Sequence, residues 1–84
     1  MITIQQIRAA RGLLGWSQTE LANRAGLSLP TVKRVEAGIG PRVSVEARTR
    51  IQNALEAGGA QFISENGGGP GVRLRKTQQR GKRK

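Results

Sequence analysis

The sequence predicts a mainly helical protein with one small domain, which ends in two short strands and a basic tail. Apolar residues recur at helical spacing in four stretches between residues 3 and 57. Ser or Thr precedes each stretch as an expected N-cap, and Gly follows each. Residues 61–65 and 72–76 instead alternate as strands do. We therefore expect a helical domain over residues 1–59, a β segment over 60–76 and a tail over 77–84.

The first predicted helix begins at the cap residue Thr3, and Gln6 three residues later completes a capping box. Arg11 falls on the apolar face that this helix forms with Ile4, Ile7 and Leu14. A guanidinium in that place needs a buried partner, or its stem must extend across the apolar surface to solvent.

The second helix begins at the cap residue Ser17, where Glu20 predicts another capping box. Trp16 and Leu21 form a hydrophobic staple around that cap. We therefore interpret the only tryptophan as a core residue rather than a platform on which a base stacks. Gly26 supplies a left-handed stop.

The third helix follows at once, with Ser28 as its expected cap. Pro30 disfavours helical geometry at Leu29, so Leu29 is the alternative cap. Val32 and Val35 face inward at helical spacing. The residues that then face outward are Leu29, Pro30, Lys33 and Arg34.

The fourth helix follows a loop over residues 39–42, in which Gly and Pro stop the third helix. It runs from the cap residue Ser44 to about Ala57, and Gly58 and Gly59 end it. Its apolar residues form one buried stripe, made of Ala47, Ile51, Ala54 and Leu55.

The two predicted strands flank a glycine-rich segment over residues 66–71. A lone two-stranded hairpin is marginal in water, and its free edges invite another strand. We therefore expect a homodimer assembled through the C-terminal strands.

The tail carries much of the charge. Residues 67–84 have seven basic groups and no acidic group, whereas residues 1–66 have eight basic and five acidic groups. With no apolar residue, 77–84 cannot support burial and are expected to be disordered. The tail either follows DNA phosphates as a mobile arm or only keeps the protein soluble.

Composition narrows the function classes. The chain has no Cys and no His, so nucleophilic triads and the usual zinc sites lack their parts. We expect no enzyme, no catalytic residue, no metal and no cofactor. A net charge of +10 predicts a polyanionic partner. No apolar run approaches the ~20 residues that span a bilayer, so we expect a cytoplasmic, nucleoid-associated bacterial protein.

The segment over residues 17–38 resembles the helix-turn-helix of the phage-repressor/Cro (XRE) family. The matching residues are S-Q-x-E-L-A from Ser17, the turn A-G-L-S from Ala25, and T-V-x-x-x-E-x-G from Thr31. The later stretches A-L-E-A-x-G-x-x-F-I and G-G-G-P-G-V-R-L resemble a short subfamily with a C-terminal β segment. The resemblance implies a lambda-repressor-like four-helix domain whose second motif helix enters the major groove of DNA.

Site residues are implied by the same resemblance, position by position. The resemblance implies a structural ion pair between Arg11 and Glu36. The residues expected to contact bases are Leu29, Pro30, Thr31 and Arg34, of which Arg34 can bond guanine O6 and N7 together. The residues expected to contact phosphates by this correspondence are Gln18, Ser28 and Lys33. Arg42 is a further phosphate candidate from its place on the loop after the third helix, and the alternative is that it is simply solvated.

The expected function is therefore sequence-specific binding of double-stranded DNA by a transcriptional regulator, most simply a repressor. A dimer would present two such helices ~34 Å apart to a palindrome. The alternative is the antitoxin of a toxin–antitoxin pair, which would add a toxin protein as partner. A third class is non-specific nucleic-acid binding through the basic tail.

Overall fold

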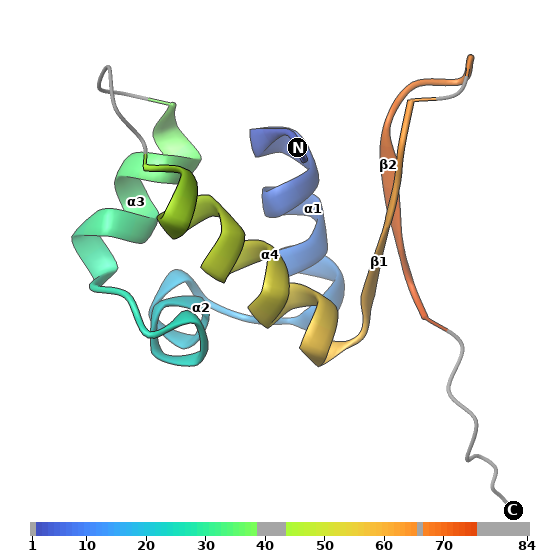
Figure 1. Ribbon diagram of the computed structural model, residues 1–84. Helices are drawn as coiled ribbons and strands as arrows, with labels where there is room; N and C mark the ends of the chain where they lie inside the picture. Colours follow the sequence, from blue (N-terminus) through green and yellow to red (C-terminus); the bar gives the residue numbers. More distant parts are fainter. Residues whose placement is uncertain (1, 39–43, 66, 76–84) are drawn as a thin grey trace, which may run out of the picture.

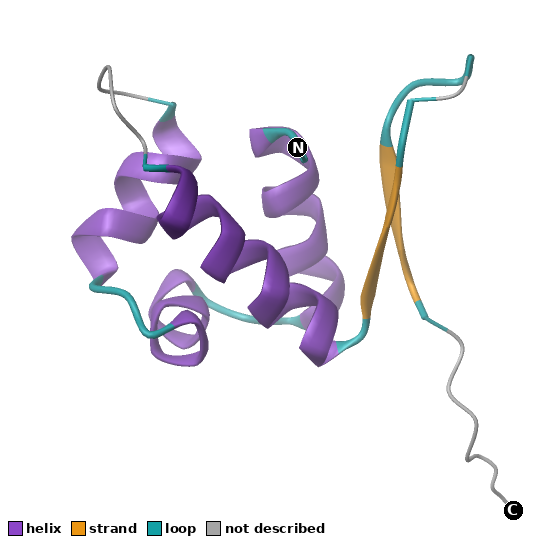
Figure 2. Cartoon of the chain, in the orientation of Figure 1, coloured by secondary structure: helices purple, strands orange, loops and turns teal. Residues whose placement is uncertain are grey.

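The computed structural model of this 84-residue chain describes residues 2–38, 44–65 and 67–75. Four helices precede two strands, as the sequence predicts (Figures 1 and 2). The elements are α1 Ile4–Leu14, α2 Gln18–Ala25, α3 Leu29–Ala37, α4 Val45–Gly58, β1 Ala60–Ile63 and β2 Gly71–Leu74. The expectations for Arg42 and for the tail over residues 77–84 lie outside the described residues.

Each helix begins at the hydroxyl residue that the sequence predicts as its cap, namely Thr3, Ser17, Ser28 and Ser44. Each hydroxyl accepts the backbone N–H three residues later, which satisfies one donor that the helix leaves open. The alternative cap Leu29 is already helical, so Pro30 takes an early helical position where its missing N–H costs no bond.

The capping box predicted at Ser17 is only half formed. Ser17 Oγ accepts the Glu20 N–H at 3.0 Å. The Glu20 carboxylate instead accepts a hydrogen bond from Arg24 Nε, one turn further along α2. The ion pair between Glu20 and Arg24, four residues apart, competes with the bond from Glu20 back to the cap, and in this structure the ion pair forms instead. At α1, by contrast, Thr3 and Gln6 form both bonds of the box.

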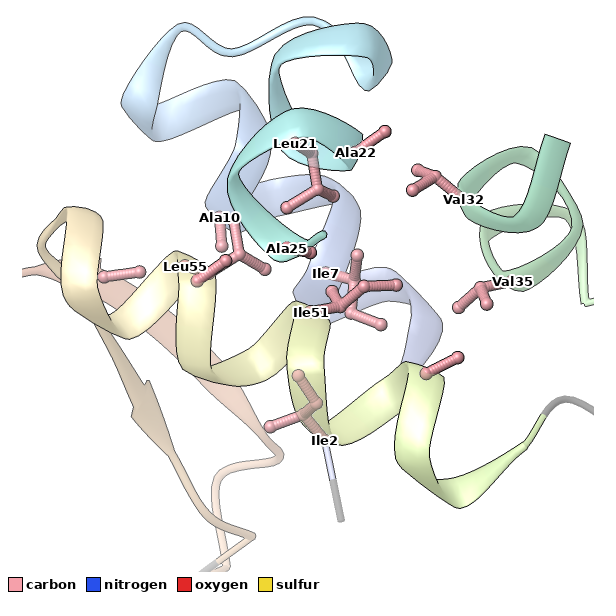
Figure 3. Packing of buried hydrophobic residues seen from close by; sticks show 13 residues of the cluster. Ile2, Ile7, Ala10, Leu21, Ala22, Ala25, Val32, Val35, Ile51 and Leu55 are labelled. Carbon is pink, nitrogen blue, oxygen red and sulfur yellow. The ribbon is translucent and has the colours of Figure 1, made fainter. Parts of the chain in front are cut away.

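The core lies between the four helices, and its largest fully buried side chains come from all of them (Figure 3). These side chains are Ile7, Leu21, Val32, Val35, Ile51 and Leu55. The predicted stripe of α4 is buried as expected. Trp16 and Leu27 are half-buried and pack against this cluster. Trp16 therefore packs on the core, as predicted, although it is only partly buried.

The two strands pair with each other as an antiparallel hairpin, in which Phe62 lies opposite Val72. Both begin and end earlier than predicted. Glu65 belongs to the turn rather than to a strand, because its carboxylate accepts the backbone N–H groups of Gly67 and Gly69. Ala60 is fully buried, and Phe62 and Val72 pack against the helical core. Helices and hairpin therefore share one core.

Gln6 fastens the hairpin to α1. Its side-chain Nε2 donates to Gly71 O at 2.8 Å and to Ile63 O at 3.2 Å, while its Oε1 accepts the Thr3 N–H. On the other side of α1, Arg8 donates to the backbone carbonyl of Glu36 in α3. At about 100° per residue, Gln6 and Arg8 lie on nearly opposite sides of α1. The hairpin therefore packs on the side of α1 away from α3.

Candidate nucleic-acid interface

The motif is built from α2, a tight turn and α3. Gly26 ends α2 in the left-handed conformation, with φ of 69°, and the Leu27 N–H donates to Ala22 O at 2.9 Å. Ser28 then caps α3. Ala22 and Ala25 of α2 and Val32 of α3 are all buried, so the two helices join the same core. The turn therefore holds α3 at a fixed angle against α2.

One face of α3 is buried and the other is exposed. Val32 and Val35 have exposed fractions of 0% and 1%, whereas Pro30, Lys33 and Arg34 are exposed and Leu29 is half-buried. In the described part of the chain, the ion pairs involve Arg11, Arg24 and Arg50, and none involves Lys33 or Arg34. Two cationic side chains on the outer face of α3 therefore have no carboxylate partner among the described residues.

The hydroxyl groups at the start of α3 bind each other. Ser28 Oγ lies 2.8 Å from Thr31 Oγ1 and also accepts the Thr31 N–H at 3.2 Å. The sequence predicts a phosphate contact for Ser28 and a base contact for Thr31. Both side chains already serve the helix start, so a contact with DNA has to add to these bonds or replace them.

The start of α2 offers backbone donors. Gln18 and Thr19 are the first two residues of this helix, and N–H groups at such positions have no acceptor within the helix. The amide of Gln18, which the sequence predicts at a phosphate, donates from Nε2 to Glu36 Oε1 at 3.1 Å. A primary amide has a second N–H, so this bond leaves one side-chain donor over.

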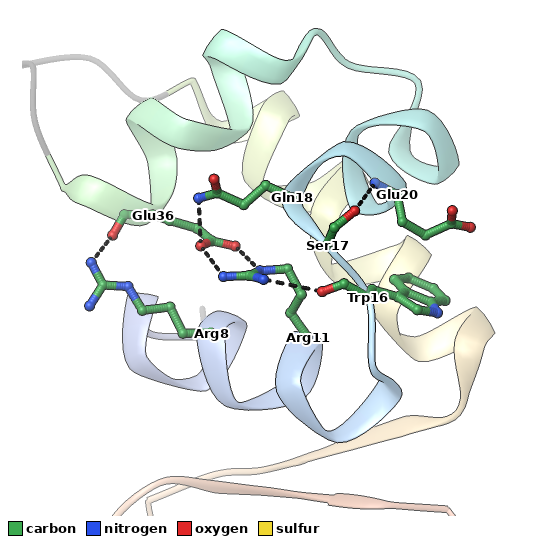
Figure 4. A network of polar contacts seen from close by, with 7 residues as sticks. All are labelled: Arg8, Arg11, Trp16, Ser17, Gln18, Glu20 and Glu36. Carbon is green, nitrogen blue, oxygen red and sulfur yellow. Dashed lines mark hydrogen bonds and ion pairs between the residues drawn. The ribbon is translucent and has the colours of Figure 1, made fainter.

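Glu36 is the centre of a polar network that connects three helices (Figure 4). Arg11 donates to its carboxylate from Nε at 2.8 Å and from Nη2 at 3.0 Å, which makes a two-pronged ion pair. Arg11 Nη1 also donates to Trp16 O at 3.1 Å. The Glu36 side chain is only 3% exposed. The implied Arg11–Glu36 pair is therefore present, and it braces α3 against α1 and the start of α2.

Two contacts beside this network have no counterpart among the predicted site residues. Arg8 donates to Glu36 O, where a cation suits the carbonyl end of α3. The Arg24 guanidinium lies 4.4 Å from the centre of the Trp16 ring and therefore covers one face of it. Arg24 stands eight residues after Trp16, a separation that predicts no contact. The sequence signal available for Arg24 is its i, i+4 spacing from Glu20 on α2, which favours an ion pair.

No helix in the described residues is both long and apolar enough to cross a bilayer; the longest, α4, has 14 residues. The buried stripe of α4 instead faces the other helices of the domain.

A family model described as a helix-turn-helix domain matches residues 5–62, which include α2, α3 and most of α1. A search of curated proteins found no match. The matched region covers more than two thirds of the chain and contains the whole motif described above. The chain belongs to the helix-turn-helix domain family, which makes it a DNA-binding protein.

Proposed function

We propose that this protein is a sequence-specific transcriptional regulator, of the XRE type and most simply a repressor, which reads the major groove with the helix over residues 28–37. The observation that carries the proposal is the outer face of α3. Lys33 and Arg34 are exposed there without a carboxylate partner among the described residues, and the opposite face is buried. A helix fixed on one side and cationic on the other suits insertion into the groove.

Base recognition in this proposal falls mainly to Arg34, whose guanidinium can bond guanine O6 and N7 together. Leu29 and Pro30 offer apolar surface of the kind that meets a thymine methyl group. Thr31 is half-buried and stands beside them at the helix start. Pro30 has no backbone N–H, so the first turn of α3 is poorly suited to hold a phosphate. This favours base contact for that turn.

Phosphate binding in this proposal falls to the start of α2 and to Lys33. The N–H groups of Gln18 and Thr19 point outward from a helix N-terminus, which attracts anions. The Glu36 network supports this role, because it ties Gln18 to the helix that enters the groove. Ser28 is the remaining phosphate candidate of the described residues.

A homodimer through the hairpin completes the proposal. A two-stranded sheet leaves strand edges free, and Leu74 on β2 has an exposed fraction of 51%. Leu13, near the end of α1, is 45% exposed. The hairpin packs on the side of α1 away from α3, so pairing there leaves the outer face of α3 uncovered. Two copies would then read a palindromic site.

The test is selection of bound sequences from random duplexes with the purified protein, followed by the same selection with Arg34→Ala. We expect one preferred site, with loss of preference at one base pair and about 1–3 kcal/mol of binding free energy in the variant. Arg50→Ala is the matched control, because Arg50 is an exposed arginine of α4 paired with Glu46. Binding that depends on salt but shows no base preference would contradict the proposal.

A further inference from the structure

A groove of about 660 Å³ lies where the hairpin meets the start of α1 and the second half of α4. Its apolar surface includes Ile2, Phe62 and Pro70, and its polar lining includes Glu56 and Glu65. Sites of this volume hold a small molecule or a few side chains of a partner. The groove is therefore large enough to be a binding site.

The two carboxylates of this groove have no cationic partner in the described part of the chain. The glutamates that form ion pairs there are Glu20, Glu36 and Glu46. Glu56 Oε2 instead accepts the side-chain amide of Gln52 at 3.2 Å, and Glu65 accepts two N–H groups of the hairpin turn. No described residue that lines the groove is Lys or Arg, although the chain has a net charge of +10. An anionic groove on a cationic protein disfavours DNA and selects a cation.

One wall of the groove is the free edge of β1. Residues 62–65 line it consecutively, and β2 contributes no lining residue. The Arg75 N–H donates to Gly59 O, so every second pair counted from these two residues exchanges backbone hydrogen bonds, and the pairs between them do not. Phe62 and Val72 form such an intermediate pair. The N–H and C=O groups of Phe62 therefore point away from β2 and toward the free edge.

We propose that this groove binds an extended basic segment of a partner protein, which adds to the free edge of β1 as a third strand. The backbone of Phe62 supplies one donor and one acceptor to that strand. The side chain placed opposite Phe62 faces the helices, as Phe62 does. An Arg or Lys at that place packs its stem on Ile2 and brings its charged head to Glu56.

The open strand edge favours a peptide over a free amine, because a small cation makes no use of the Phe62 backbone groups. It also argues against a second copy of this chain. Two β1 edges paired by two-fold symmetry would bring the carboxylates of both copies together, and like charges that face each other across strands are destabilising.

This inference goes beyond the proposed function, because it adds a protein partner that binds at the same time as DNA. No residue of α2 or α3 lines the groove. In Figure 1, α3 and the hairpin lie on opposite sides of α1. The groove also lies along β1, so the edge of β2 with Leu74 stays free for the proposed homodimer.

The experiment is a titration of the ¹⁵N-labelled full chain with the peptide acetyl-Thr-Val-Arg-Val-Thr-amide at low salt, followed by amide chemical shifts. The same peptide with Gln in place of Arg is the neutral counterpart. We expect shift changes at residues 62–65 and at Gln52 and Glu56, and affinity for the Arg peptide on the order of tenfold higher. Equal affinity for the two peptides, or shift changes confined to β2, would overturn the inference.

Glu56→Gln and Glu65→Gln should each reduce the preference for the Arg peptide, with circular dichroism to verify folding. Glu46→Gln is the matched control, because Glu46 lies on the same helix as Glu56 but outside the groove. Agmatine, a free guanidinium compound, should leave the Phe62 amide unshifted, and the same shift there would replace the strand by a small-cation site. Shifts at residues 62–65 that depend on protein concentration without peptide would assign the groove to a second copy. The titration needs no DNA, so failure of the proposed function leaves this test intact.

Discussion

Glu36 is the polar side chain that connects α3 to α1 and to the start of α2. Its carboxylate is almost fully buried and receives bonds from Arg11 and Gln18. A buried carboxylate is stable only while its partners remain, so loss of a partner costs more than the pair contributes. The same pairing at the protein surface contributes little.

Arg11→Ala should therefore lower the free energy of unfolding by about 3 kcal/mol, near the lower end for a broken buried pair because Arg11 is 24% exposed. Arg50→Ala removes an arginine from an exposed pair and should cost less than about 1 kcal/mol. Urea unfolding followed by circular dichroism gives both values. Equal stability of the two variants would show that Arg11 has no structural role.

Two glycines in helices predict opposite outcomes of the same substitution. Gly58→Ala places a Cβ against the Trp16 ring and Leu14, which should destabilise by about 1–3 kcal/mol through overpacking. Gly12→Ala meets nothing within 4 Å and should stabilise α1 by about 0.5–1 kcal/mol. Thermal and urea unfolding of both variants provide the measurement. A stabilising Gly58→Ala would mean that the ring of Trp16 moves aside freely.

Among the helices and strands, one amide bonds α1 to the hairpin, beside the apolar packing of Phe62 and Val72. The Oε1 atom of Gln6 accepts one hydrogen bond at the start of α1, and its Nε2 atom donates to two strand carbonyls. Both polar atoms of this amide therefore have partners. Its residue is 6% exposed, which makes each lost bond expensive.

Gln6→Glu keeps the acceptor for the Thr3 N–H but turns a carboxylate oxygen toward two carbonyl oxygens. We expect the free energy of unfolding to fall by about 2–3 kcal/mol. Relative to the unmodified protein, amide exchange should accelerate more in the hairpin than in α3. Gln5→Glu, the same change on the exposed neighbouring residue, is the control. Unchanged exchange in β1 and β2 would show that apolar packing alone holds the hairpin.

Local sequence determined much of the fold. The four caps and their glycines act within one helical turn, so the Ser or Thr before each apolar repeat predicted the start of each helix. The outer face of α3 followed from the inward spacing of Val32 and Val35. The partner of Arg11 came from resemblance to a family, because residues 25 apart leave no periodic signal.

Contacts across the chain were the part that sequence could not supply. The donors of Gln6 meet carbonyls 57 and 65 residues away, and the capping box had already explained why a glutamine stands there. Glu65 continued the alternating pattern of a strand, yet its carboxylate binds glycine amides in the turn. A local pattern already explained each residue, so nothing in the sequence indicated the contact of Gln6 with the strands or that of Glu65 with the turn.

For the whole molecule, the proposed dimer predicts that an exposed residue of the hairpin matters more than an exposed residue elsewhere. Leu74→Lys should weaken self-association roughly tenfold or more without lowering the free energy of unfolding. Val45→Lys changes a residue that is 66% exposed at the start of α4 and should leave association unchanged. Sedimentation equilibrium distinguishes the two. Deleting the hairpin is a poorer test, since Ala60 is fully buried in the core.

A dimer that survives Leu74→Lys at full strength would place the interface away from the exposed end of β2. In that case Leu13→Lys is the next variant, because Leu13 is the exposed leucine near the end of α1.

The position of α1 between α3 and the hairpin has a mechanical consequence. Arg8 and Arg11 bond to Glu36 of α3 on one side of α1, and Gln6 bonds to the strands on the other. A rotation of α1 about its own axis would therefore strain the bonds to α3 and the bonds to the hairpin at the same time. In the proposed complex, the orientation of the outer face of α3 is therefore coupled to the orientation of the hairpin through α1.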